Sequence, residues 1–132
     1  MKTELYKKLF EIFLECSEKD WDGYHANPAD PQSFAGTIIF LNYFPSDLPL
    51  PDLMPEPNGD LCMVWKNNGY TLMVSVCCLI NWKGYIKWNG ILPEGHKPSS
   101  FLWTETSLAI PNELIIIIKK LNPNWKSNNA NI

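Results

Sequence analysis

The amino-acid sequence predicts an α+β domain, in which an antiparallel sheet of three to four strands packs against two N-terminal helices and a C-terminal helix. Two observations predict this class. Apolar residues recur at helical spacing before residue 45 and after residue 110, whereas between 60 and 106 apolar and polar residues alternate around glycine turns. A chain of 132 residues can bury one core unaided. Residues 1–123 are therefore expected to form a single domain, followed by a frayed polar tail over 124–132.

The first predicted element is an amphipathic helix over residues 3–17. Its apolar positions fall into two adjacent rows, Leu5, Leu9, Ile12 or Phe13, and Cys16 in one, and Tyr6, Phe10 and Leu14 in the other. Such a wide stripe is expected to pack against the core, although docking of this helix into a partner's groove is an alternative.

The second predicted helix begins with Asp30 as its N-cap and Pro31 at the first helical position. It is expected to end before Pro45, because the residue preceding a proline is disfavoured in helical geometry. The five prolines between residues 45 and 57 then predict an extended connector, whose leucines are expected to pack inward. A proline-rich ligand for an aromatic groove is the alternative function of this segment.

A β-hairpin is predicted from Asp60 onward, where Asn68-Gly69 has the composition of a two-residue turn. Placing the turn there pairs Asn67 with Tyr70. The apolar partners on one face are then Trp65 with Leu72, Met63 with Val74, and Leu61 with Val76. This agreement between turn and alternation predicts the register. The second strand, over residues 70–80, is apolar on both faces and is expected to be central.

Two further strands are expected near residues 85–92 and 101–106, the first with an unspecified register. A final helix is predicted to start at Pro111 and to end near Lys119 and Lys120, where cations favour the helix dipole. The segment Ile115–Ile118 also has the composition of a strand, but Pro111 and Glu113 favour a helix.

The charge pattern disfavours nucleic-acid binding. The net charge is -3, and all eleven basic residues are lysines, scattered along the chain. Arginine, the preferred residue for bidentate contacts with phosphate and guanine, is absent. Another protein is the expected partner, and a homodimer is compatible with this composition.

The cysteines and the N-terminal segment indicate a protein of the reducing cytoplasm without a metal or other cofactor. Cys16, Cys62, Cys77 and Cys78 lie in apolar runs without CxxC spacing, as is typical of buried thiols. Residues 1–17 are too charged for a signal peptide, and no apolar run approaches the roughly 18 residues of a membrane helix.

The loop from Asp20 to Pro28 contains the strongest candidate site residues, Trp21, Asp22, Tyr24 and His25. In the structural interpretation, Gly23 permits a turn, the aromatic rings pack onto the helices, and Asp22 accepts hydrogen bonds from loop amides. In the catalytic interpretation, Asp22 or Asp20 orients His25 for acid/base chemistry. The structural interpretation is preferred, so Asp22 and His25 are only weak catalytic candidates.

This loop also carries a resemblance to a known pattern. Matching residues are Trp21, Asp22, Gly23, Tyr24, Ala26 and Pro28, followed by Pro55, Pro57, Gly59 and Trp65. The arrangement resembles a poorly characterised family of small bacterial and mobile-element proteins, over about residues 1–76. The resemblance implies a mobile-element setting and no particular activity. His25 departs from the pattern, which has a second glycine there, and this argues against a catalytic role shared by the family.

Other titratable residues are less informative. Glu56, Asp60, Glu94 and Glu105 lie near predicted strand ends and could form a carboxylate pair in space, but their spacing does not choose between pairs. His96 is expected to be exposed. The sequence contains no nucleophile elbow, phosphate-binding loop, zinc-protease or dinucleotide motif, which lowers the expectation of an enzyme.

The six tryptophans indicate a binding surface, since a chain of this size has little room to bury all of them. The residues expected to bind a partner are Trp21, Asp22, Tyr24, Trp82, Tyr85 and Trp88. We therefore expect a non-enzymatic protein-binding module, and the mobile-element setting favours an inhibitor of the anti-defence, antitoxin or immunity type. The alternatives are a small hydrolase or transferase around Asp22 and His25, and a small-ligand binding domain with a pocket between helices and sheet.

Overall fold

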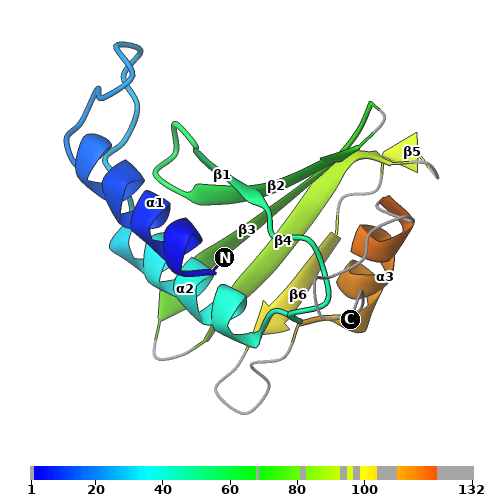
Figure 1. Ribbon diagram of the computed structural model, residues 1–132. Coiled ribbons are helices and arrows are strands. Elements are labelled where there is room, and N and C mark those ends of the chain that lie inside the picture. The colour runs from blue at the N-terminus through cyan, green and yellow to red at the C-terminus, as the bar shows by residue number, and fades with distance from the viewer. Residues whose placement is uncertain are drawn as a thin grey trace.

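An antiparallel sheet with helices on one face forms the molecule, as the sequence predicts (Figure 1). The computed structural model describes residues 2–67, 69–80, 83–92, 95–96, 99–103 and 110–121. In chain order the elements are α1 (Lys2–Glu15), α2 (Pro31–Tyr43), β1 (Asp52–Pro55), β2 (Leu61–Asn67), β3 (Tyr70–Ile80), β4 (Lys83–Leu92), β5 (Gly95–His96), β6 (Ser99–Trp103) and α3 (Asn112–Leu121). The α+β class is confirmed.

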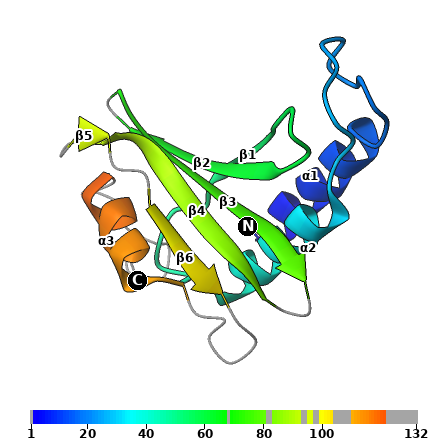
Figure 2. The same ribbon diagram turned by 180° about the vertical axis from the view of Figure 1, so that it is seen from behind.

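The described part of the sheet has six strands, in the order β1-β2-β3-β4, with both β5 and β6 paired to β4. Strand β3 is central, as expected, and the sheet is twisted, so that β2 runs at an angle to β4 and β6 (Figures 1 and 2). Strands β1 and β5 were not foreseen. Strand β1 lies in the proline-rich connector, where Pro55 is tolerated because the strand is at the sheet edge.

The hairpin of β2 and β3 has the predicted register. Asn67 pairs with Tyr70, Trp65 with Leu72 and Met63 with Val74. All six apolar residues predicted to share a face, Leu61, Met63, Trp65, Leu72, Val74 and Val76, are buried. The turn chemistry and the apolar alternation therefore identified the inner face of the sheet correctly.

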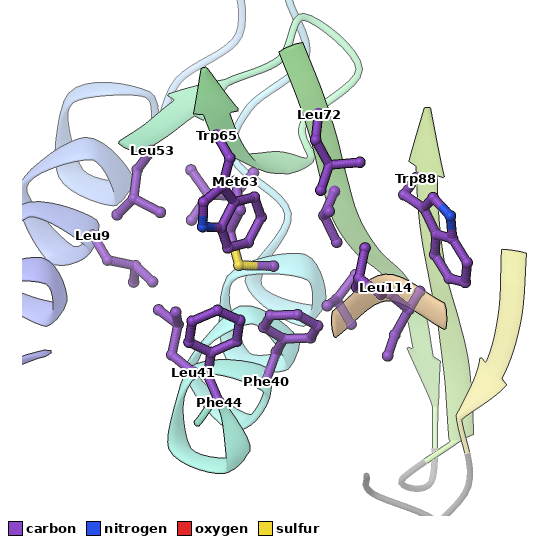
Figure 3. Packing of buried hydrophobic residues seen from close by; sticks show 14 of the residues in the cluster. Leu9, Phe40, Leu41, Phe44, Leu53, Met63, Trp65, Leu72, Trp88 and Leu114 are labelled. Carbon is purple, nitrogen blue, oxygen red and sulfur yellow. The ribbon is translucent and has the colours of Figure 1, made fainter. Parts of the chain in front are cut away.

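The core lies between this inner face and the helices (Figure 3). Leu9 from α1, Phe40 and Leu41 from α2, and Leu114 from α3 converge on the sheet residues. The ring of Phe44, at the end of α2, lies 5.6 Å from that of Trp65. One continuous apolar cluster thus fills the space between the helices and the sheet. This is the space in which the alternative prediction placed a ligand pocket.

The first two helices begin and end largely as predicted. The Asp30 carboxylate accepts a hydrogen bond from Gln32 N–H (3.0 Å), and α2 ends before Pro45. In α1 only one of the two predicted apolar rows is fully packed. Phe10 and Leu14, from the second row, are exposed, so the buried stripe is narrower than expected. Helix α1 contacts chiefly α2 and β1, so part of its apolar stripe has no neighbouring element to pack against.

Residues Asn112–Leu121 are helical, which decides between the helix and strand interpretations. Its buried face consists of Leu114, Ile118 and Leu121. The side-chain amide of Asn67 donates to Leu121 O (2.6 Å), joining the end of α3 to the hairpin. The predicted tail over 124–132 lies outside the described residues. Within the described part of the chain, every helix is too short or too polar to cross a membrane.

Candidate functional site

In the loop from Asp20 to Pro28, which we call the elbow loop, backbone N–H groups donate hydrogen bonds to the loop's own carboxylates. Asp22 Oδ1 accepts from the N–H groups of Tyr24 (2.8 Å) and Ala26 (3.1 Å). Asp20 Oδ1 accepts from the backbone N–H of His25 (2.6 Å). These are the local contacts by which aspartates stabilise turns. The catalytic interpretation needs a carboxylate on the His25 ring, whereas both carboxylates here hold loop amides.

The elbow loop adopts left-handed backbone geometry at three positions, Asp20 (φ 66°), Gly23 (φ 77°) and His25 (φ 65°). This region disfavours residues with a Cβ, and glycine occupies it freely. Glycine is thus the residue that this backbone conformation favours at position 25. The residue type at position 25 is therefore restricted by the backbone conformation rather than by a role of the side chain.

The base of the elbow loop is joined to the turn between β1 and β2. Asn27 N–H donates to Pro57 O (2.7 Å), and Asp30 N–H donates to Gly59 O (2.8 Å). A Cβ on Gly59, whose φ is +98°, would lie 2.8 Å from Pro28 O. The two segments that carry the resemblance, far apart in the chain, are consequently in direct contact.

The predicted binding residues of the elbow loop have different positions. Trp21 is half-buried against the core, and its Nε1 donates to Asn27 O (2.7 Å). Tyr24 is exposed at the loop. Among the described residues, no group of three or more His, Cys, Asp or Glu side chains could hold a metal ion.

A hollow of about 250 Å³ lies on the other face of the sheet, opposite the core. This outer face comprises the strand residues that alternate with the core residues, namely Asp52, Met54, Cys62, Val64, Lys66, Thr71, Met73, Ser75, Tyr85, Lys87, Asn89 and Ile91. The hollow is lined by Cys62, Met73, Ser75, Lys87 and Asn89 from the strands. Residues Glu56, Asn58 and Asp60 of the β1–β2 turn and Trp88 of β4 complete its lining.

Two carboxylates share the hollow. The hydroxyl of Ser75 donates to Glu56 Oε1 (2.9 Å). Burial raises the pKa of Asp60, and repulsion from Glu56 and Asp30 adds to the rise, while Asn58 and Lys87 act against it. Of the four candidate carboxylates, the structure therefore brings Glu56 and Asp60 together. Glu94 and Glu105 lie outside the described residues.

Cys62 is a buried, weakly acidic thiol in the hollow. Burial, with a smaller contribution from Glu56, raises its pKa to about 11. A thiol with this pKa is almost entirely protonated at neutral pH, and the thiolate is the nucleophilic form. Cys62 therefore serves as a packing residue, as the apolar surroundings of the cysteines predict.

Exposed apolar side chains share the outer face with the hollow. Met54 is 41%, Tyr85 46% and Ile91 65% exposed. Trp88, which was expected beside Tyr85, is instead 3% exposed in the core. The reason is the strand alternation, since residues three apart point to opposite faces. Trp82 lies outside the described residues.

Glu56 and Asp60 were predicted from the sequence as candidate carboxylates, but the hollow was not predicted. Ser75, Lys87 and Asn89 had no distinguishing signal, because ordinary polar residues on alternate strand positions are typical of any solvated sheet face. If the register of β3 and β4 had been known, it would have predicted that Ser75, Lys87 and Asn89 lie together on one face. That register was the part of the sheet that the alternation left open.

Fold and site together define an α+β domain whose outer sheet face carries a small, acidic hollow. Comparison of the chain with protein-family models, with curated proteins and with solved structures gives no match. The function is therefore argued from the geometry of the site.

Proposed function

We propose that this chain is a non-enzymatic binding module that attaches to another protein through the outer face of its sheet. The observation that carries the proposal is the hollow on that face. Within the described residues, the buried apolar side chains of all three helices belong to the core on the opposite face. On the outer face, Cys62 and Val64 are buried, whereas Met54, Tyr85, Lys87, Asn89 and Ile91 are exposed in the described part of the chain and could contact a partner.

The size of the hollow favours a single side chain over a small-molecule ligand. Pockets for drug-sized ligands span about 300–1,000 Å³ and enclose most of the ligand surface. The hollow, at about 250 Å³, is smaller, and Lys87 and Asn89 in its lining are exposed. A side chain projecting from a partner's surface matches these dimensions.

The charge of the hollow favours a basic side chain. Glu56, Asp60 and Asp30 lie close enough for their charges to repel, and this repulsion contributes to the raised pKa of Asp60. A lysine or arginine of the partner would relieve the repulsion and donate charge-assisted hydrogen bonds to the carboxylate oxygens. Lys87 offsets only part of the negative charge. The net charge of -3 would also attract a basic partner.

The exposed apolar residues around the hollow supply the rest of the interface. Met54, Tyr85 and Ile91 lie on the same face as the carboxylates. Methionine and tyrosine are enriched in protein interfaces, where a few apolar anchors carry most of the binding energy. A mixed surface of this kind fits a protein partner better than a nucleic acid or a lipid.

A pair of matched substitutions tests the proposal. Ile91→Asp alters the outer face, and Ile116→Asp alters α3 at another exposed isoleucine, 45% exposed. With a photo-crosslinking residue at Asn89, the wild-type chain should capture one protein from its native cell lysate through a lysine- or arginine-containing peptide. Ile91→Asp should weaken binding of that purified partner at least about ten-fold, and Ile116→Asp should not.

Equal losses for both isoleucine variants, or crosslinks to the partner from a probe placed at Ile116 of α3 and none from the probe at Asn89, would contradict the proposal. In the mobile-element setting that the resemblance implies, such a module would act as an inhibitor of a host or rival protein. The identity of the crosslinked protein, together with the neighbouring genes, distinguishes an antitoxin, an immunity protein and an anti-defence protein.

A further inference from the structure

The turn that carries the carboxylates of the hollow is held by backbone contacts from the elbow loop, at Asn27, and from Asp30, two residues beyond the loop. Glu56 and Asp60 are the two ends of this turn, and both line the hollow. Between them, Pro57 O accepts from Asn27 N–H (2.7 Å) and Gly59 O accepts from Asp30 N–H (2.8 Å).

We propose that the elbow loop is a positioning element for the hollow, which acts through Asn27 and Gly59 to fix the Glu56–Asp60 turn. The inference rests on the proposed function for the purpose of the hollow, but its geometry can be tested without a partner. It gives the elbow loop a role in binding that requires no contact between the loop and the partner.

Close packing makes this connection stiff. A Cβ on Gly59 would lie 2.8 Å from Pro28 O, and both groups belong to the backbone. The two nearest atoms, Pro28 O and Asp30 N, are backbone atoms and cannot swing aside as the end of a side chain can. The turn and the base of the elbow loop must therefore move together.

A second anchor restrains the strands beside the turn. Ser33 of α2 is fully buried, and its hydroxyl accepts from Leu61 N–H (3.0 Å) and donates to Val76 O (2.8 Å). Leu61 directly follows Asp60 in the chain, and Val76 directly follows Ser75. The turn is also closed by its own hydrogen bonds, from Gly59 N–H to Glu56 O (2.9 Å) and from Glu56 N–H to Asp60 O (2.9 Å). The contacts to Pro57 and Gly59 therefore set the position of the turn as a unit.

The decisive variant is Gly59→Ala, with Gly69→Ala as its matched control. Both glycines have positive φ, +98° and +82°, but a Cβ on Gly69 meets nothing within 4 Å. The two variants share the backbone cost of alanine in this region, and only Gly59→Ala presses on the elbow loop. Asn27→Pro, which removes the N–H bonded to Pro57, is a second variant that acts from the opposite side of the contact.

Two measurements at the hollow report the position of the turn in the full chain. The first is the NMR titration of the Asp60 carboxyl, and the second is the rate of Cys62 alkylation by iodoacetamide, measured by peptide mass spectrometry. Gly59→Ala should accelerate alkylation at least about five-fold relative to Gly69→Ala and move the Asp60 titration toward that of an ordinary aspartate. Asn27→Pro should change both in the same direction.

The inference is overturned if Gly59→Ala and Asn27→Pro leave both measurements at the values of Gly69→Ala. Should Gly59→Ala fail to fold, Asn27→Pro decides by the same criteria. If the hollow changes but partner binding does not, the positioning role stands and the proposed function fails. If the hollow is unchanged and Ile91→Asp still abolishes binding, the proposed function stands and the positioning role fails.

Discussion

The elbow loop and the hollow both contain carboxylates among aromatic and polar neighbours, but they use them differently. In the elbow loop, Asp20 and Asp22 are bonded to backbone amides of the same loop. In the hollow, Glu56 accepts a hydrogen bond from Ser75 and Asp60 accepts one from Asn58, but burial and the neighbouring carboxylates nevertheless raise the pKa of Asp60. Satisfied polar groups stabilise a conformation, whereas crowded charges facing open space are typical of a binding site.

A segment with many conspicuous residues can have a structural role rather than a binding role. The elbow loop has the more conspicuous residues, yet Gly23 and position 25 reflect backbone geometry, and Trp21 packs on the core. The hollow consists of residues that look ordinary one by one. Their arrangement, rather than their type, distinguishes them.

The largest effect is expected for Trp21→Ala, which removes a half-buried ring and its hydrogen bond to Asn27 O. We expect a loss of about 2 kcal/mol in the free energy of unfolding, below the range for fully buried tryptophans. Trp21→Phe keeps most of the packing and should lose about 1 kcal/mol. Urea denaturation measures both. If Trp21→Ala left the free energy of unfolding unchanged but abolished partner binding, the elbow loop would instead be a surface that contacts the partner.

Asp22→Ala tests the loop's internal hydrogen bonds. Two backbone N–H groups, those of Tyr24 and Ala26, would lose their acceptor, and we expect a loss of about 1.5 kcal/mol. Asp22→Asn retains an oxygen acceptor and should cost less than about 0.5 kcal/mol. Thermal and urea unfolding distinguish them. If Asp22 acts through its charge instead, both variants should lose function to the same extent, and neither should change the free energy of unfolding.

His25→Gly should stabilise the chain by about 0.5 kcal/mol, since glycine removes the left-handed strain at φ 65° at some cost in chain entropy. Tyr24→Gly is the matched control, because Tyr24 is exposed and is not among the residues with positive φ. It should destabilise by about 0.5 kcal/mol. Differential scanning calorimetry can resolve the opposite signs, and destabilisation by both would contradict the conformational explanation of position 25.

The smallest effect concerns Asp60 in the hollow. Because the folded pKa is raised, the folded state binds a proton more readily than the unfolded state, and the stability associated with Asp60 falls as pH rises through the folded pKa. Asp60→Asn should therefore stabilise by about 0.3 kcal/mol at pH 7, since the group is partly exposed. The gain should vanish below about pH 3.9. A gain that grew on acidification would contradict the crowding of the carboxylates.

Much of the fold could be predicted because local rules and long-range packing agreed. Asn68-Gly69 and the alternation around it predict the same hairpin register, and Asp30, Pro31 and Pro45 bound α2. Strand β1 was missed because Pro51 and Pro55 are typical of an unpaired connector, and its pairing depends on the neighbouring edge of β2. The exposure of Phe10 likewise depends on where the sheet ends.

Of the candidate site, the sequence supplied Glu56 and Asp60 without a reason to pair them. Their proximity depends on the five-residue turn and on the contacts that Asn27 and Asp30 make with it. Trp88 was expected on one exposed face with Tyr85, although residues three apart in a strand point to opposite faces in any register. Only the fold decided which of the two side chains faces the core.

The sequence by itself determined the α+β class, the helix boundaries, the hairpin and the inner face of β2 and β3, because these follow from turn chemistry and hydrophobic periodicity. Only the tertiary structure decided which polar residues meet. Convergence of Glu56, Ser75 and Lys87 depends on strand pairing across distant segments. The tertiary structure likewise assigned the elbow loop to support and the sheet's outer face to candidate recognition, since bonding partners and open space are properties of the folded chain.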